Sequence, residues 1–161
     1  MTWRHIVKPY DTGDMSATVP TVFQRFKLPT SIGNHLLHGM HAGVIVVGNP
    51  TFTALTMELW SDDGDGPGKL IATSSTSWLK AQIHTLNHAV KQVGFAFNKV
   101  PLRSGLYYCA ALRASGYTGA DASYLGWRYS YPDPQYRTGL TIEVVKGLYF
   151  PFDLSVIGSP R

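Results

Sequence analysis

The chain has 161 residues, of which 44% are apolar and only 15% are charged. This length fits one domain, residues 1–161, and the single cysteine, Cys109, excludes a disulfide framework within the chain. The formal charge of +4 comes from 14 basic and 10 acidic residues without any adjacent Lys or Arg pair, which argues against nucleic acid as a partner. No apolar run is long enough to cross a membrane, so no membrane partner is expected.

Segments in which apolar and polar residues alternate with period two recur along the chain, separated by turns rich in Gly, Pro and Asp. Eight of them are predicted to be β-strands: 19–28, 36–47, 51–60, 70–75, 90–100, 106–113, 124–131 and 138–145. Together they predict an all-β protein with a single antiparallel β-sandwich of about eight strands. Residues 1–18 are left as an N-terminal segment and residues 146–161 as an extended apolar C-terminal arm.

Three histidines at intervals of three residues lie around the second predicted strand, and a further pair follows downstream: His35, His38, His41, His84 and His88. A strand points residues three apart to opposite faces, so the first three could share a metal ion only if Gly39 introduces a bulge. The downstream pair would share a face only on a helix. Because no cysteine ligand or His-Glu-x-x-His pattern accompanies them, no metal site is predicted.

The segment 51–60 shows one of the two clearest alternations. Its odd positions from Leu55 to Leu59 are predicted to face the core, and its even positions, which include Glu58, to face water. The last predicted strand repeats the scheme and places Glu143 on the water side. These are the only glutamates of the chain, so a carboxylate pair for sugar hydrolysis is not expected.

A turn with three aspartates follows this strand: Asp62, Asp63 and Asp65. Gly64, Gly66, Gly68 and Pro67 supply the backbone conformations that a hairpin tip needs. A calcium ion prefers six to eight oxygen ligands, and no glutamate closes this loop as it would in an EF-hand. We therefore predict a β-hairpin with a polar tip that does not need a bound ion, and calcium binding stays open as the alternative.

The same hairpin carries a recurrent signature. Residues 59–62 read Leu-Trp-Ser-Asp, and residues 67–75 read Pro-Gly-Lys-Leu-Ile-Ala-Thr-Ser-Ser. Downstream, residues 93–97 read Val-Gly-Phe-Ala-Phe and residues 100–108 read Val-Pro-Leu-Arg-Ser-Gly-Leu-Tyr-Tyr. This pattern resembles jelly-roll-like β-sandwich modules of phage virion proteins (tail, fibre and capsid-associated components) and of bacterial surface proteins. The resemblance covers 55–112 and implies a jelly-roll-like fold, but it brings no catalytic residue with it.

Residues 77–88 break the alternation. Trp78, Leu79, Ile83 and Leu86 are spaced closer to a helical turn than to a strand. A short helix or an irregular crossover between the sheets is predicted there.

An aromatic cluster in residues 117–136 is the candidate binding site: Tyr117, Tyr124, Trp127, Arg128, Tyr129, Tyr131 and Tyr136. Aromatic faces beside polar groups are what sugar rings need for stacking and hydrogen bonding. The same composition is typical of protein interfaces, and it also occurs in cores. All three interpretations stay open from the sequence.

The C-terminal arm carries the candidate assembly residues: Leu148, Tyr149, Phe150, Phe152 and Leu154. Burying a side chain of this size stabilises by about 1.5–3 kcal/mol relative to exposure, so the arm is too apolar for a solvated tail. We expect it to pack either on its own domain as a further strand or on a neighbouring subunit.

Catalytic motifs are missing: the sequence has no Gly-x-Ser-x-Gly elbow, phosphate loop or dinucleotide fingerprint. Cys109 has no catalytic Cys-His signature around it and is expected to be a small buried side chain. The sequence therefore predicts a protein that is not an enzyme and needs no cofactor.

The functional prediction is a non-enzymatic structural virion protein of a phage, capsid- or tail-associated, that forms homo-oligomers and docks on other virion proteins. The alternative is a carbohydrate- or receptor-binding module, adhesin- or lectin-like, whose partner is a host glycan. Because no signal peptide is recognised at the N-terminus, assembly in the host cytoplasm and a final location in the virion are expected.

Overall fold

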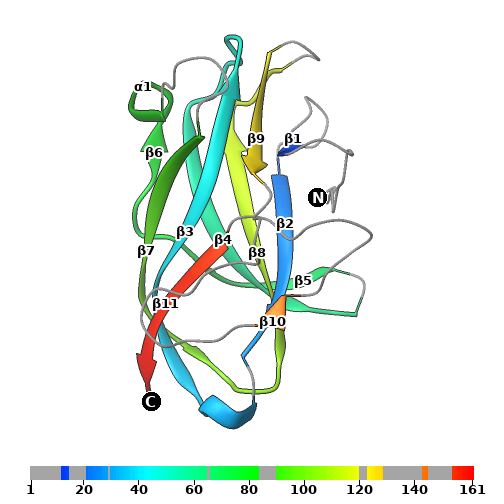
Figure 1. Ribbon diagram of the computed structural model, residues 1–161, viewed down its shortest axis with the longest axis vertical. Helices are drawn as coiled ribbons and strands as arrows, with labels where there is room; N and C mark the ends of the chain where they lie inside the picture. The colour runs from blue at the N-terminus through cyan, green and yellow to red at the C-terminus, as the bar shows by residue number, and fades with distance from the viewer. Residues whose placement is uncertain are drawn as a thin grey trace.

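The structure is a computed structural model that describes residues 12–14, 21–28, 30–64, 66–83, 90–119, 123–128, 143–144 and 154–161. Within these residues most regular elements are β-strands, which form two packed antiparallel sheets (Figure 1). The all-β antiparallel sandwich predicted from the alternation is thus confirmed. The described part of the chain contains no helix with the length and hydropathy needed to span a bilayer.

The two sheets are named after their central strands. The β8 sheet has the order β10-β2-β8-β4-β5, with β6 also paired to β4. Its strands are β2 (Thr21–Lys27), β4 (Ala54–Asp62), β5 (Pro67–Thr73), β6 (Trp78–Leu79), β8 (Tyr107–Ser115) and β10 (Glu143–Val144). The β3 sheet has the order β1-β9-β3-β11, and β7 also pairs with β3. Its strands are β1 (Thr12–Asp14), β3 (His35–Val47), β7 (Val90–Leu102), β9 (Tyr124–Arg128) and β11 (Leu154–Pro160).

Each of the predicted strand segments overlaps an observed strand. The break in alternation at 77–88 also has a counterpart, because β6 leads directly into the four-residue helix α1 (Lys80–Ile83). Residues 84–88, which complete that segment, lie outside the described residues. A short 3-10 helix, η1 (Thr30–Ile32), joins β2 to β3.

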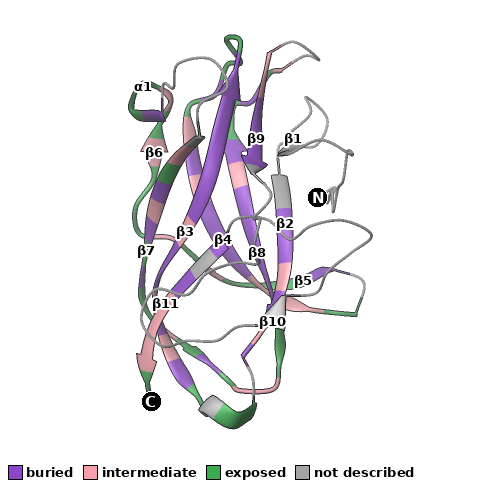
Figure 2. Ribbon diagram, in the orientation of Figure 1, coloured by how far each residue is buried: buried purple, intermediate pink, exposed green. Residues whose placement is uncertain are grey.

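The core lies between the two sheets, and buried residues follow β3 along much of its length (Figure 2). Leu55, Met57 and Leu59 of β4 are fully buried, as their alternation predicts. The largest fully buried side chains include Trp127 of β9 and Phe26 of β2. Residues from both sheets therefore share one contiguous apolar interior.

The prediction that Glu58 faces water is wrong. Its side chain lies on the outer face of the β8 sheet, but only 5% of the residue is exposed. Trp60 Nε1 donates a hydrogen bond to Glu58 Oε2 at 2.9 Å, and Arg113 Nη1 donates to Glu58 Oε1 at 3.2 Å. Period two predicts which face of the sheet a residue takes, whereas long neighbouring side chains decide how far that face is covered. The side chain of Glu143 lies outside the described residues.

The signature segment after β5 joins the edges of the two sheets. Ser74 N donates to the carbonyl oxygen of Met57 in β4 at 2.8 Å, and Ser75 N donates to that of Ala96 in β7 at 2.8 Å. Thr76 Oγ1 accepts a hydrogen bond from Ala96 N at 2.9 Å. Hydroxyl and backbone groups of residues 74–76 thus form hydrogen bonds with backbone groups at the edges of both β4 and β7. The signature residues Ser74 and Ser75, together with Thr76, therefore connect the two sheets through hydrogen bonds at this edge.

Candidate functional site

The candidate binding cluster divides between the core and the surface. Trp127 is fully buried, and Tyr117 is buried with its hydroxyl oxygen accepting a hydrogen bond from Leu125 N at 3.2 Å. Tyr124 is half-buried at the start of β9. The side chains of Tyr117 and Trp127 are therefore part of the apolar core and are not exposed for contact with a partner. The remaining members are Arg128, whose backbone alone is described, and Tyr129, Tyr131 and Tyr136, which lie outside the described residues.

The candidate assembly residues divide in a similar way. Leu154 opens β11, lies opposite Ala42 of β3 and is fully buried, as is Val156 two residues later. The sequence predicts that the arm packs either on its own domain as a further strand or on a neighbouring subunit. Leu154 shows the first arrangement, because it belongs to a strand of its own domain. The other four, Leu148, Tyr149, Phe150 and Phe152, lie outside the described residues.

The first histidine group lies on a bulged strand. The pairing of β3 with β11 passes from Gly39 opposite Ile157 to Leu37 opposite Gly158, so His38 is the extra residue. His38 Nε2 and Ser159 Oγ share a hydrogen bond of 2.7 Å.

Among the described histidines, His35 and His41 do not complete a metal site around this bulge. His35 Nδ1 lies 3.0 Å from the carbonyl oxygen of Gly33, and His41 is half-buried with an interaction of its own. No group of three or more His, Cys, Asp or Glu side chains is arranged to hold a metal ion in the described ranges. His84 and His88 lie outside these ranges.

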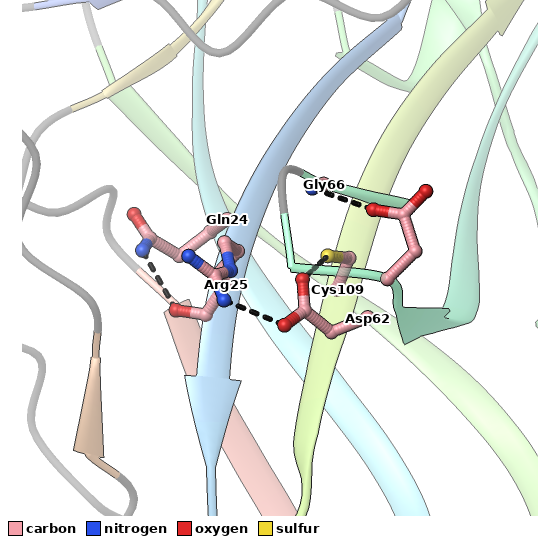
Figure 3. A network of polar contacts seen from close by, with 6 residues as sticks. Gln24, Arg25, Asp62, Gly66 and Cys109 are labelled. Carbon is pink, nitrogen blue, oxygen red and sulfur yellow. Dashed lines mark hydrogen bonds and ion pairs between the residues drawn. The ribbon is translucent and has the colours of Figure 1, made fainter. Parts of the chain in front are cut away.

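Two aspartates of the β4–β5 hairpin, Asp62 and Asp63, bind neighbouring protein groups (Figure 3). Asp62 Oδ2 forms an ion pair with Arg25 Nη2 of β2 at 2.6 Å. Asp63 closes the tip, since its Oδ1 accepts a hydrogen bond from Gly66 N at 3.1 Å and its own N donates to Gly66 O at 3.0 Å. This is the turn geometry predicted for the loop. Asp65 lies outside the described residues.

Cys109 lies beneath this ion pair, and the prediction that it is buried is confirmed. Its Sγ donates to Asp62 Oδ1 at 3.8 Å, and it packs with Phe23, Ala111 and Trp60 in a small second cluster on the outer face of the β8 sheet. Burial first, and then the charge of Asp62, raise the pKa of the thiol to about 12. The thiol is therefore protonated and inert near neutral pH.

Backbone contacts tie three segments together at the end of the sandwich where β7 turns into β8. Arg103 N donates to the Tyr108 hydroxyl oxygen at 2.8 Å, a contact similar to the tyrosine corner of other β-sandwich proteins. Ser104 N donates to Asn34 Oδ1 at 2.9 Å, and Arg161 N donates to the carbonyl oxygen of Asn34 at 3.0 Å. Figure 1 shows the C-terminus at this same end of the molecule.

A hollow of about 660 Å³ opens beside this junction. Its walls include Ile71 of β5, Pro101 at the end of β7, Leu106 just before β8 and Tyr107 at the start of β8. Ile71 is 42% exposed, Leu106 50% and Tyr107 40%. The Tyr107 ring is flanked by cations, with Arg25 Cζ 5.2 Å from the ring centroid. We call this feature the β5/β8 hollow.

Sequence reasoning missed the β5/β8 hollow. It assigned Ile71 and Leu106 to strand segments, where one face is normally covered. Their exposure arises from the separation between β5 and the β7–β8 turn, which are distant in sequence. The one sequence signal for this region is the Leu-x-x-Gly turn at residues 102–105, before Tyr107 and Tyr108. It indicates a turn at this position but does not indicate that the surface beside it is hollow.

No protein-family model matches the chain, and no curated protein is similar to it at a significant level.

Proposed function

We propose that this protein is a non-enzymatic structural subunit of a phage particle, capsid- or tail-associated, which acts by docking on other virion proteins and on copies of itself. The proposal is supported by the resemblance of residues 55–112 to jelly-roll-like virion modules. It is also supported by the position of the signature residues, since Ser74 and Ser75 connect the two sheets of the sandwich.

The observation that carries the proposal is the clustering of exposed apolar side chains. Five large hydrophobic side chains of the described residues are at least 40% exposed, and four of them lie on β5, just before β8 or at its start: Leu70, Ile71, Leu106 and Tyr107. Three of these, Ile71, Leu106 and Tyr107, line the β5/β8 hollow. The fifth, Leu79, lies at the opposite end of the sandwich (Figure 1). Apolar groups that gather at one place on a surface are typical of a site that another molecule covers.

The polar groups of the same region favour docking over catalysis. Glu58 is bound by Trp60 and Arg113, and Asp62 is bound by Arg25. These carboxylates are used to hold strands together. A general acid or base needs instead a carboxylate that reaches a substrate.

Fractionation of the particles tests this function. Cells that carry the gene are infected or induced, the released particles are purified on a density gradient, and their proteins are quantified by mass spectrometry. We expect this protein in the particle band at a constant ratio to the most abundant virion protein. Its presence only in the fraction of unassembled protein would overturn the proposal. A monomer whose tryptophan fluorescence responds to glycans would replace it with the receptor-binding alternative.

A further inference from the structure

The β5/β8 hollow combines apolar walls with an excess of positive charge. Arg103 and Arg161 line it, and the guanidinium of Arg103 has no partner among the described residues. The one acidic residue of the lining is Asp62, whose carboxylate is already paired with Arg25 at 2.6 Å and is almost fully buried. An occupant with a negative charge is therefore favoured over a neutral or positive one.

The hollow also adjoins a strand edge. β5 is the last strand of the β8 sheet among the described residues, where β4 is its strand partner. The backbone groups along the outer edge of such a strand can pair with an extended segment of another chain. Ile71 of this strand lines the hollow, and the exposed Leu70 precedes it in the strand. A peptide in extended conformation matches both the strand edge and the apolar walls, whereas a sugar would use only part of them.

We propose that the β5/β8 hollow receives an extended peptide segment of a neighbouring protein subunit, which inserts an apolar side chain between Ile71 and Leu106 and places a carboxylate near Arg103. This assignment rests on the proposed function, because it specifies how the subunit docks. The occupant is a segment in which an aromatic or aliphatic residue lies one or two positions from Asp or Glu.

Peptide selection tests the chemistry of this occupant directly. A library of random heptapeptides is selected on the immobilised protein, and the enriched peptides are synthesised for titration calorimetry. We expect sequences that combine an apolar residue with a neighbouring acid, and weaker binding when that acid is replaced by its amide. No enrichment, or enrichment without an acidic residue, would overturn the inference.

Two pairs of variants localise the binding. Arg103→Gln removes a charge at the hollow and Lys80→Gln removes one at the opposite end, while Leu106→Ser and Leu79→Ser shorten leucines that are 50% and 52% exposed. Arg103→Gln is expected to weaken peptide binding about three- to fivefold, as an exposed ion pair would. Leu106→Ser is expected to weaken it about tenfold through lost apolar contact. Unchanged binding in both hollow variants, or an equal loss in the remote controls, would overturn the assignment.

Two further results separate this inference from the proposed function. If N-acetylneuraminic acid binds the protein and Arg103→Gln abolishes that binding while selected peptides do not bind, the hollow takes an acidic sugar and the peptide assignment is wrong. If the protein is a constant component of the particle but neither hollow variant changes its incorporation, the proposed function stands and the inference fails. If the unaltered protein is missing from particles, the proposed function itself fails.

Discussion

At the residue scale, the outer face of the β8 sheet is held by polar groups that neutralise one another. Arg25 is paired with Asp62 across β2 and the end of β4, and this pair covers Cys109. The pKa of Arg25 is raised, first by its hydrogen bond to Asp62. Because the carboxylate is almost fully buried and the guanidinium only partly so, the pair acts as a cover over a small apolar cluster.

The thiol of Cys109 is predicted to weaken the fold at high pH. Its pKa rises from the ordinary 9.0 to about 12 in the folded protein. Above pH 9 the unfolded chain loses a proton that the folded protein keeps, so the stabilisation is complete below pH 9 and is lost as the pH rises toward 12. At about pH 10 the wild-type protein should lose roughly 1 kcal/mol more stability, relative to about pH 8, than Cys109→Ala. Urea unfolding at the two pH values measures this, and equal losses would contradict it.

Gly66 is predicted to be necessary for the close packing of the hairpin tip against Phe23. It has a φ of +153°, and a Cβ at this position would lie 3.1 Å from Phe23 Cζ. Gly64 has a φ of +106° but nothing within 4 Å of its Cβ position, so Gly64→Ala reports backbone strain alone. We expect Gly66→Ala to destabilise the protein by about 1–2 kcal/mol more than Gly64→Ala, because Phe23 must move. Thermal unfolding of both variants measures the difference, and equal effects would show that the tip does not press on Phe23.

At the element scale, alternation predicted eight of the strands, because each of these has a face toward a common core. It did not predict β1 or β6, which have only three and two residues, and it left β11 open as a further strand or an arm on a neighbouring subunit. Leu55 and Leu59 illustrate this, since they are fully buried at alternate positions. The candidate site was less predictable. Tyr and Trp serve cores and interfaces equally well, so the burial of Trp127 and the exposure of Leu106 depend on which elements pack over them. The alternation of apolar and polar residues along a strand carries no information on which elements pack over that strand.

The corner between β5 and β6 is predicted to stabilise the sandwich through single hydrogen bonds. Thr76→Val keeps the side-chain shape but leaves Ala96 N without the Oγ1 acceptor that lies 2.9 Å away. The expected cost is about 1 kcal/mol, together with faster hydrogen exchange at the Ala96 amide. Thr73→Val on the exposed face of β5 is the matched control and should change neither quantity. An unchanged Ala96 exchange rate in Thr76→Val would show that this bond does not join the sheets.

Strand β11 is predicted to be part of the domain core. Leu154 is fully buried against β3, so Leu154→Ala should cost about 2–4 kcal/mol in free energy of unfolding. The exposed Leu79 provides a control, since Leu79→Ala should stay within about 0.5 kcal/mol of the original protein. Chemical denaturation of the dilute protein measures both. A Leu154→Ala variant that is as stable as the control would mean that β11 does not belong to the folded domain.

At the scale of the whole molecule, the two ends of the sandwich differ in what they offer to a partner. One end carries α1 and the exposed Leu79, while the other carries the β5/β8 hollow with Ile71, Leu106 and Tyr107. A rigid sandwich with one apolar, positively charged end is suited to being mounted on a larger assembly in a single orientation. We therefore expect a surface substitution to abolish docking at the β5/β8 hollow and not at the opposite end of the sandwich.

Competition during particle assembly tests this claim most directly. Cells express the unaltered protein together with either Leu106→Ser or Leu79→Ser, each distinguished by mass, and the ratio of the two forms is measured in purified particles and in the unassembled fraction. Both substitutions shorten a leucine that is about half exposed, so their effects on folding should be alike. We expect Leu106→Ser to be depleted from particles about tenfold relative to the unassembled fraction, whereas Leu79→Ser should enter them in proportion to its share of that fraction. Equal incorporation of the two variants would contradict this expectation.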